Sequence, residues 1–273
     1  MDRQELLDRT AIFVLDMDGT YYLGEGILPG AREFLDAVLN AGRHYMFFTN
    51  NSSRSPEDYI EKLAGMDTHI TPDQIMTSGD VMIDYLKAHR PGKKVFLMGT
   101  EPLFKSFENA GIPLSDDDPD MVVLGFDKTL TYDRMTAACT FIREGAEFLA
   151  THPDINCPVE GGFIPDCGAI TAAMSLSTGV TPLITGKPYE ETVEAVISRA
   201  ERVMGRRPER GEVTFVGDRL YTDIATGVNN GAMGALVLTG ESTPGDVEKS
   251  DVKPDAVYRS LGEMGELLAG GSR

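Results

Sequence analysis

The sequence predicts an α/β protein with a parallel-sheet core and a second, smaller α/β domain inserted into it. Three observations lead to this prediction. Short apolar runs alternate with helical patterns along most of the chain. Several runs contain no polar residue, which is typical of strands buried on both faces of a parallel sheet. Polar residues follow the ends of four expected strands, at the edge where open α/β sheets bind ligands.

The amino-acid composition and net charge exclude some classes of binding partner. Hydrophobic residues make up 41% of the 273 residues and charged residues 25%, as in ordinary soluble domains. Lys and Arg number 25 against 43 Asp and Glu, which gives a formal net charge of −18. No basic stripe offsets this surplus of acid, so we expect no nucleic-acid partner and no anionic-membrane partner.

The cysteines and the uncharged segments indicate the cellular compartment in which the protein is expected. Cys139, Cys157 and Cys167 show no CxxC spacing, so neither a disulfide framework nor a zinc site is expected. The charged residues 1–5 do not resemble a secretory signal. The longest uncharged run, residues 167–186, is interrupted by Gly, Pro and many Ser and Thr. It is therefore a poor candidate for a membrane-spanning helix. We therefore expect a cytoplasmic protein.

The first expected strand is followed directly by two carboxylates. The apolar residues 12–15 precede Asp16 and Asp18, and Gly19 then allows a sharp turn. Carboxylates this close repel one another unless a cation lies between them or one of them is protonated. A strand followed by an ordinary Asp-Gly turn would explain these residues equally well on their own.

The remaining elements are expected at the following positions. Up to residue 88 they are a flap at 21–28, a helix from 29, a strand at 44–49, a helix at 56–63 and a strand–helix pair at 75–88. The helix from 29 has Phe34, Leu35, Val38 and Leu39 on one face. A second set has strands at 95–98, 121–126 and 147–150, helices at 102–110 and 132–143, an irregular loop at 151–168 and a helix near residue 169. A strand at 181–185 then resumes the first domain, before a helix at 192–204 and strands at 213–216, 235–238 and 256–258.

Polar residues at four strand ends supply the groups that phosphoryl transfer to water requires. They are Asp16 and Asp18, Thr49 and Asn50, Lys187, and Asp218 and Asp223. One carboxylate can attack phosphorus and another can protonate the leaving oxygen, while a hydroxyl, backbone amides and an ammonium neutralise the phosphoryl oxygens. Further carboxylates can hold Mg²⁺. Each residue alone has an ordinary structural explanation, but their ordered occurrence after apolar runs favours a common site.

These residues resemble the motifs of the haloacid dehalogenase (HAD) superfamily of phosphatases. Asp16-Met17-Asp18-Gly19-Thr20 resembles its first motif, Thr49 its second, Lys187 its third, and Gly217-Asp218 with Asp223 its fourth. The segments 49–52 and 185–188 are similar to those of the NagD-like, p-nitrophenylphosphatase-type subfamily, which has a type IIA (C2) cap. The resemblance implies a Rossmann-like core and extends over essentially the whole chain.

The resemblance also implies a role for each residue. Asp16 is the expected nucleophile, and Asp18 the general acid and then the general base. Thr49 and Lys187 are expected to bind the phosphoryl group, helped by the backbone amide of Asn50. Asp16, the backbone carbonyl of Asp18 and Asp218 are the expected Mg²⁺ ligands. Asp223 is expected to support the metal's water shell or to orient Lys187.

The spacing of the motifs places the inserted domain. More than a hundred residues separate Thr49 from Lys187, far more than one βαβ connection requires. We expect residues 1–80 and 180–273 to form the core and residues 81–179 to form the cap. The resemblance implies that the cap covers the active site and selects the substrate, with His152 and Asp154 as specificity candidates. His152 stands where the subfamily commonly has Asn, and a structural hydrogen bond would explain it equally well.

The resulting hypothesis is a Mg²⁺-dependent phosphatase that acts on a small phosphorylated metabolite, such as a sugar phosphate or a nucleoside monophosphate, through an aspartyl-phosphate. A phosphotransferase or mutase of the same fold is one alternative, because another hydroxyl could intercept the aspartyl-phosphate. A non-catalytic sensor of a phosphate ligand is the other. Dehalogenase chemistry is disfavoured because it has no use for an acid at Asp18. A homo-oligomer is compatible with the sequence.

Overall fold

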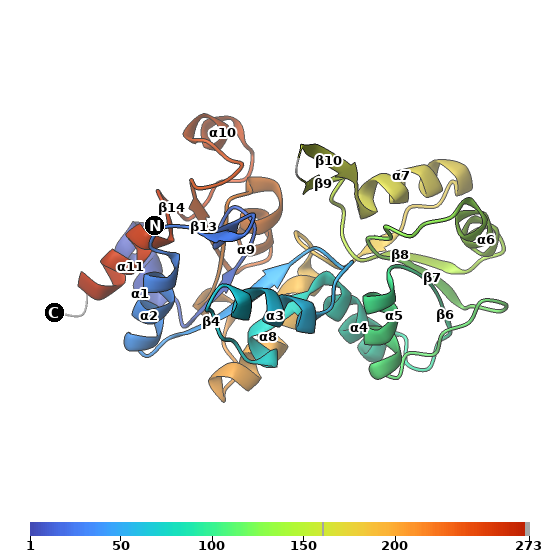
Figure 1. The fold of residues 1–273 in the computed structure, drawn as a ribbon, viewed down its shortest axis with the longest axis horizontal. Coiled ribbons are helices and arrows are strands. Elements are labelled where there is room, and N and C mark those ends of the chain that lie inside the picture. The colour runs from blue at the N-terminus through green and yellow to red at the C-terminus, as the bar shows by residue number, and fades with distance from the viewer. Residues whose placement is uncertain (160, 271–273) are drawn as a thin grey trace. The chain divides into compact units, whose positions relative to one another are not determined.

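The computed structural model describes residues 1–159 and 161–270, and these form two compact units (Figure 1). The first unit contains residues 1–49, 57–76 and the described chain from residue 187 onward. The second contains residues 50–56 and 77–186. The range 81–179, expected to form the cap, lies entirely within the second unit. Each unit has its own sheet and its own hydrophobic core.

The first unit is built on a six-stranded sheet in the order β14-β13-β12-β1-β4-β5. Its strands are β1 (Ile12–Leu15), β4 (His44–Thr49), β5 (Ile75–Thr77), β12 (Val213–Gly217), β13 (Met233–Val237) and β14 (Ala256–Tyr258). β1 lies between β12 and β4 and is parallel to both, with Val14 opposite Phe215 on one side and Met46 on the other. All four residues of β1 are buried, because neighbouring strands and helices enclose it. The predicted parallel-sheet core is confirmed.

Helices and short elements complete the first unit. The helices are α1 (Arg3–Arg9), α2 (Ala31–Asn40), α3 (Pro56–Gly65), α8 (Glu190–Met204), α9 (Ala225–Asn229), α10 (Pro244–Lys249) and α11 (Leu261–Gly270). Single turns are η1 (Pro72–Gln74), η2 (Arg210–Glu212) and η3 (Leu220–Ile224). The expected flap contains an antiparallel pair, β2 (Tyr22–Leu23) and β3 (Gly26–Ile27).

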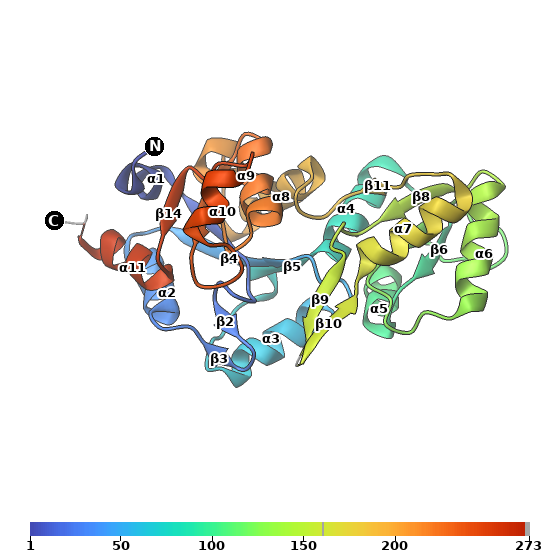
Figure 2. The same cartoon turned by 90° about the horizontal axis from the view of Figure 1, so that it is seen from above.

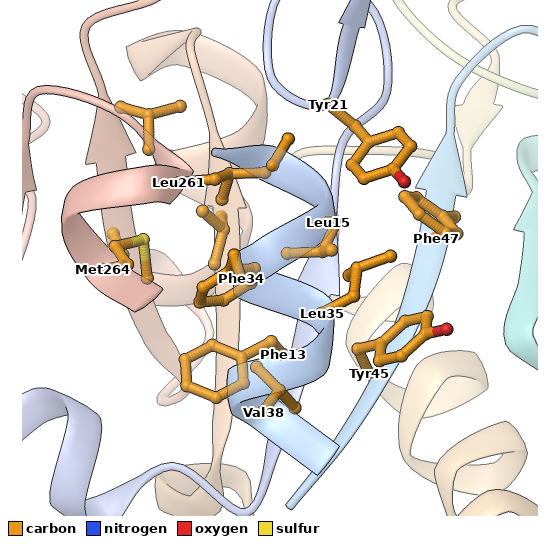
Figure 3. Packing of buried hydrophobic residues seen from close by; sticks show 14 of the residues in the cluster. Phe13, Leu15, Tyr21, Phe34, Leu35, Val38, Tyr45, Phe47, Leu261 and Met264 are labelled. Carbon is orange, nitrogen blue, oxygen red and sulfur yellow. The ribbon is translucent and has the colours of Figure 1, made fainter. Parts of the chain in front are cut away.

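Helix α2 packs its apolar face between the sheet and α11 (Figure 3). Phe34 is fully buried and meets the ring of Phe13 edge to face, with ring centroids 5.3 Å apart. Leu35 and Val38 are buried beside it. Leu39 was expected on the same face, but that prediction was wrong, since 52% of the residue is exposed. Leu39 lies one helical step of about 100° beyond Val38, which carries it past the buried face.

The second unit contains a parallel four-stranded sheet in the order β11-β8-β7-β6. Its strands are β6 (Val95–Met98), β7 (Met121–Leu124), β8 (Glu147–Ala150) and β11 (Leu183–Ile184), and its helices are α4 (Ser78–His89), α5 (Glu101–Asn109), α6 (Tyr132–Arg143) and α7 (Cys167–Thr178). The strand expected to resume the first domain at 181–185 belongs instead to this sheet, where Leu183 pairs with Leu149. Helix α7 is a crossover that returns the chain beside β8, as parallel strands require.

The segment 151–168, predicted to be irregular, contains an antiparallel hairpin (Figure 2). Its strands are β9 (Asn156–Val159) and β10 (Gly162–Pro165). Phe163 pairs with Pro158, and this proline, together with the glycines at 161 and 162, hid the strand pattern in the sequence. Among the described residues, no helix combines the length and apolar character needed to cross a membrane.

The packing of α2 generates the first prediction. Phe34→Ala should lower the free energy of unfolding by about 3–5 kcal/mol, because it leaves a cavity against Phe13 and α11. Leu39→Ala on the same helix is the matched control and should change it by less than about 0.5 kcal/mol, as expected for an exposed site. Urea denaturation of the purified variants measures both values. Equal losses for the two variants would contradict this description of the core.

Candidate active site

Asp16 lies at the carboxyl end of the central strand. Its backbone N–H donates to the carbonyl of Val216 at 2.9 Å, so the residue continues the pairing of β1 with β12. The side chain is buried. The chain then turns at Gly19, whose φ of +84° is in the left-handed region that favours glycine. A Cβ on Gly19 would also lie 2.6 Å from Oδ2 of Asp218, which shows how closely the two strand ends approach.

Lys187 places an ammonium group among buried carboxylates. Its Nζ lies 2.7 Å from Oδ1 of Asp16 and 2.5 Å from Oδ1 of Asp223. The lysine is 3% exposed, and both carboxylates are also buried. Burial alone would lower the pKa of Lys187, but the charges of Asp16 and Asp223 outweigh it and raise that pKa above its usual value. The lysine therefore remains a cation at neutral pH.

Asp218 is held by backbone and hydroxyl donors. The N–H of Glu241 donates to its Oδ2 at 2.7 Å, and Oγ1 of Thr20 donates to its Oδ1 at 3.3 Å. Burial, and after it the charge of Asp16, raises the pKa of Asp218 to about 6. Burial likewise raises the pKa of Asp223, although Lys187 opposes this effect. The cluster thus has more negative charge than a single ammonium compensates.

Asp18 has a different environment from Asp16. It is exposed at the start of the turn, where it forms a bridge with Tyr22. Partial desolvation, and then the charge of Asp16, raises the pKa of Asp18 above its usual value. A carboxyl group that retains its proton more readily, and that solvent can reach, is suited to general acid–base chemistry.

The carboxylates form a set of donors that fits a hard divalent cation. Oxygen atoms of Asp16, Asp218 and Asp223 all lie within 4.8 Å of one another. Oxygen-only donors at a crowded anionic site suit Mg²⁺, and a dication would favour the ionised form of Asp218 against the burial and the Asp16 charge that raise its pKa. Asp223 already accepts from Lys187 and from the N–H of Arg219, whereas Asp218 accepts from the N–H of Glu241 and the hydroxyl of Thr20 and has no contact with Lys187 among those described.

The other predicted site residues lie at the end of β4 and in the second unit. Thr49 is the last residue of β4 and is half-buried. Asn50 follows it and belongs to the second unit, where its Nδ2 donates to Oδ2 of Asp154 at 3.2 Å and its carbonyl accepts from Ser78. The structure therefore brings Asp16, Lys187, Asp218 and Asp223 together, and separately joins Asn50 to Asp154.

His152 lies between two carboxylates of the second unit. The imidazole is fully buried, with Nδ1 3.4 Å from Asp154 and Nε2 3.5 Å from Asp166. Asp166 also caps α7 by accepting from the N–H of Cys167. Since its two nitrogens face different carboxylates, His152 is arranged as a bridge within this unit. This geometry favours the structural role that the sequence left open.

Three residues of interest were not selected from the sequence. Asp166 could have been found as an aspartate immediately before a helix, which is a common N-cap position. Arg219 directly follows Asp218 in the sequence, and its guanidinium is largely covered and pairs with Glu241 at 3.1 Å. Glu241 follows Asp218 by 23 residues, and no spacing rule connects the two.

Two family models match the chain. A model of haloacid dehalogenase-like hydrolases matches residues 13–113, and a second, HAD-hydrolase-like model matches residues 184–264. An acid sugar phosphatase of Staphylococcus aureus is 36% identical over 252 residues, which is 92% of this chain and 95% of the relative. The chain belongs to the haloacid dehalogenase-like hydrolases.

Comparison with solved structures identifies the subfamily of this HAD hydrolase. A 4-nitrophenylphosphatase from Thermotoga maritima is 44% identical, with a TM-score of 0.90 over 96% of this chain and 98% of that one. NagD from E. coli K-12 is 30% identical, with a TM-score of 0.84 over 93% and 98% of the two chains. The chain is therefore a NagD-like HAD phosphatase, and the family predicted from the motifs is confirmed.

The close approach of the loops to Asp218 generates the second prediction. A Cβ on Gly240 would lie 2.0 Å from Oδ2 of Asp218, so Gly240→Ala must displace that carboxylate. Turnover of p-nitrophenyl phosphate should fall by roughly 10²-fold, the cost of moving a reacting group by about 1 Å. In the control, Gly245→Ala, the added Cβ meets nothing closer than 3.8 Å, and activity should be unchanged. Normal turnover by Gly240→Ala would show that Asp218 is dispensable in this geometry.

Proposed function

We propose that this HAD phosphatase hydrolyses the phosphate ester of a small metabolite through an aspartyl-phosphate formed on Asp16. One observation carries the proposal. Asp16 is buried at the end of the central strand, 2.7 Å from the Lys187 ammonium and in the same cluster as Asp218. A carboxylate, a cation for the phosphoryl oxygens and a candidate metal ligand thus meet at the carboxyl end of the central strands.

In the first step, a carboxylate oxygen of Asp16 attacks phosphorus and the bond from phosphorus to the ester oxygen breaks. Asp18 donates its proton to the departing oxygen, which leaves as an alcohol. Partial burial and the charge of Asp16 raise the pKa of Asp18, so this carboxyl holds a proton more readily than an ordinary aspartate, which supports the role. Lys187 stabilises the negative charge on the phosphoryl oxygens, and Thr49 and the backbone amide of Asn50 are proposed to bind the same group.

In the second step, Asp18 accepts a proton from water as the water attacks the aspartyl-phosphate. The bond between phosphorus and Asp16 breaks, which releases inorganic phosphate and restores the carboxylate. When bound to Asp16, Asp218 and the backbone carbonyl of Asp18, Mg²⁺ supplies positive charge that offsets the phosphoryl oxygens. Asp223 orients Lys187 through the 2.5 Å contact, so that the ammonium remains directed toward Asp16.

The substrate we propose is a sugar phosphate. The groups assigned above bind the phosphoryl group and the metal, which all phosphate esters share, so recognition of the sugar must come from other residues. We assign it to the second unit. Exposed side chains of the hairpin, such as Phe163 at 71%, are better candidates than the fully buried His152. The names of the relatives, acid sugar phosphatase and 4-nitrophenylphosphatase, support a small phosphate ester.

The covalent mechanism predicts different losses for the two aspartates. Asp16→Asn should abolish turnover of p-nitrophenyl phosphate, because an amide is a far poorer nucleophile than a carboxylate. Asp18→Asn should reduce turnover by about 10²–10⁴-fold, the usual contribution of general acid–base catalysis. Asp251→Asn is a control for the same chemical change at an exposed site. Wild-type turnover by Asp16→Asn would exclude Asp16 as the nucleophile.

The metal assignment predicts a strict dependence on Mg²⁺. Turnover should be lost after treatment with EDTA and should return when Mg²⁺ is added back. Ca²⁺ should restore it poorly, because it prefers more ligands and longer bonds than the compact pair of Asp16 and Asp218 offers. Steady-state assays after exhaustive chelation test this directly. Full activity of the metal-free protein would rule out an essential metal.

A further inference from the structure

We propose that the side chain of Glu241 positions the Mg²⁺ site, by holding in place the loop whose backbone N–H fixes Asp218. The inference rests on the function proposed above, because it assumes that Asp218 is a metal ligand. Glu241 lies between β13 and α10 in the first unit and is 23 residues from Asp218 in the chain. Its role would be that of a positioning residue, since it acts through Asp218.

The backbone of this loop lies directly against Asp218. The N–H of Glu241 donates to Oδ2 of Asp218 at 2.7 Å, and the N–H of Ser242 donates to the carbonyl of Asp218 at 3.1 Å. Gly240 approaches the same carboxylate so closely that no side chain would fit there. The direction of the Asp218 carboxylate therefore depends on where this loop sits.

The side chain of Glu241 fixes the loop to the segment that follows Asp218. Its Oε2 accepts from Nε of Arg219 at 3.1 Å and from the hydroxyl of Tyr221 at 3.2 Å. These contacts close a ring that runs from Asp218 along the chain to Arg219, through the Glu241 carboxylate, and back through the Glu241 N–H to Asp218. A ligand held in such a ring is oriented before the metal binds.

The Glu241 carboxylate also forms an ion pair with the Arg219 guanidinium. Burial disfavours the charged form of Arg219, but the nearby carboxylates of Asp16, Asp223 and Asp218 outweigh it and raise the pKa of Arg219. Without a side-chain acceptor at position 241, the Arg219 guanidinium could turn toward the carboxylates of Asp16 and Asp218. The Glu241 side chain is 51% exposed, so its pairing with Arg219 should add little to folding stability. Its loss should therefore appear in metal binding and leave the fold intact.

Calorimetric titration with Mg²⁺ tests the inference without relying on activity. Glu241→Ala should bind Mg²⁺ roughly tenfold more weakly than the wild type, as is usual when a group that orients a ligand is removed. Glu241→Gln should stay within about twofold of the wild type, because its amide oxygen can still accept from Arg219 and Tyr221. Glu194→Ala removes an arginine partner with a similar exposure of 50% and should bind normally.

Steady-state assays provide the second measurement. The Mg²⁺ concentration for half-maximal turnover should shift for Glu241→Ala by the same factor as the binding constant, with kcat at saturating Mg²⁺ preserved. If Glu241→Ala does not fold, Tyr221→Phe serves instead, since it removes one of the two donors and should weaken binding in the same direction.

Two results would overturn the inference. One is wild-type Mg²⁺ affinity in Glu241→Ala. The other is an equal loss in Glu241→Ala and Glu241→Gln, because that would assign the effect to charge and not to position. A failure of the proposed function looks different: the wild type and Asp218→Asn would then show the same Mg²⁺ titration.

Discussion

The buried contact of Lys187 with Asp16 and Asp223 is the constraint on which the catalytic end of the first unit depends. Removing charges from water is costly, and these groups are stable in the interior only because each has an opposite charge within 2.7 Å. Asp218 adds a further carboxylate to the cluster. The Arg219 guanidinium lies near the same carboxylates, so Lys187, Arg219 and a bound Mg²⁺ would all offset their negative charge.

The sheet makes this concentration of charge possible. β1 is held in register between β12 and β4, so Asp16 and Asp218 leave adjacent strands at the same edge. Their carboxylates can approach because the nearby positions carry no side chain. Gly19 and Gly240 lie against Asp218, and Gly217 lies against Asp223. Burial in this closely packed site, and after it the charge of Asp16, raises the pKa of Asp218.

Much of the fold could be predicted because local patterns determined it. The uninterrupted apolar run 12–15 and the amphipathic helix α8 both formed as expected. The failures occurred where a pattern was short or ambiguous. The run 181–185 was assigned to the wrong sheet, since two paired residues, Leu183 and Ile184, carry no information about which neighbour they will join. The hairpin of β9 and β10 was hidden because proline and glycine interrupt it.

For the functional site, the sequence by itself determined the family, the parallel-sheet core and the set of chemical groups at the strand ends. It could do so because each group directly follows a recognisable strand. Only the tertiary structure decided which of them touch. It pairs Lys187 with both Asp16 and Asp223, buries His152 between Asp154 and Asp166, and brings Glu241 onto Asp218. Contacts of this kind join residues far apart in the chain, and their geometry follows from strand register and loop packing, which no local pattern of residues encodes.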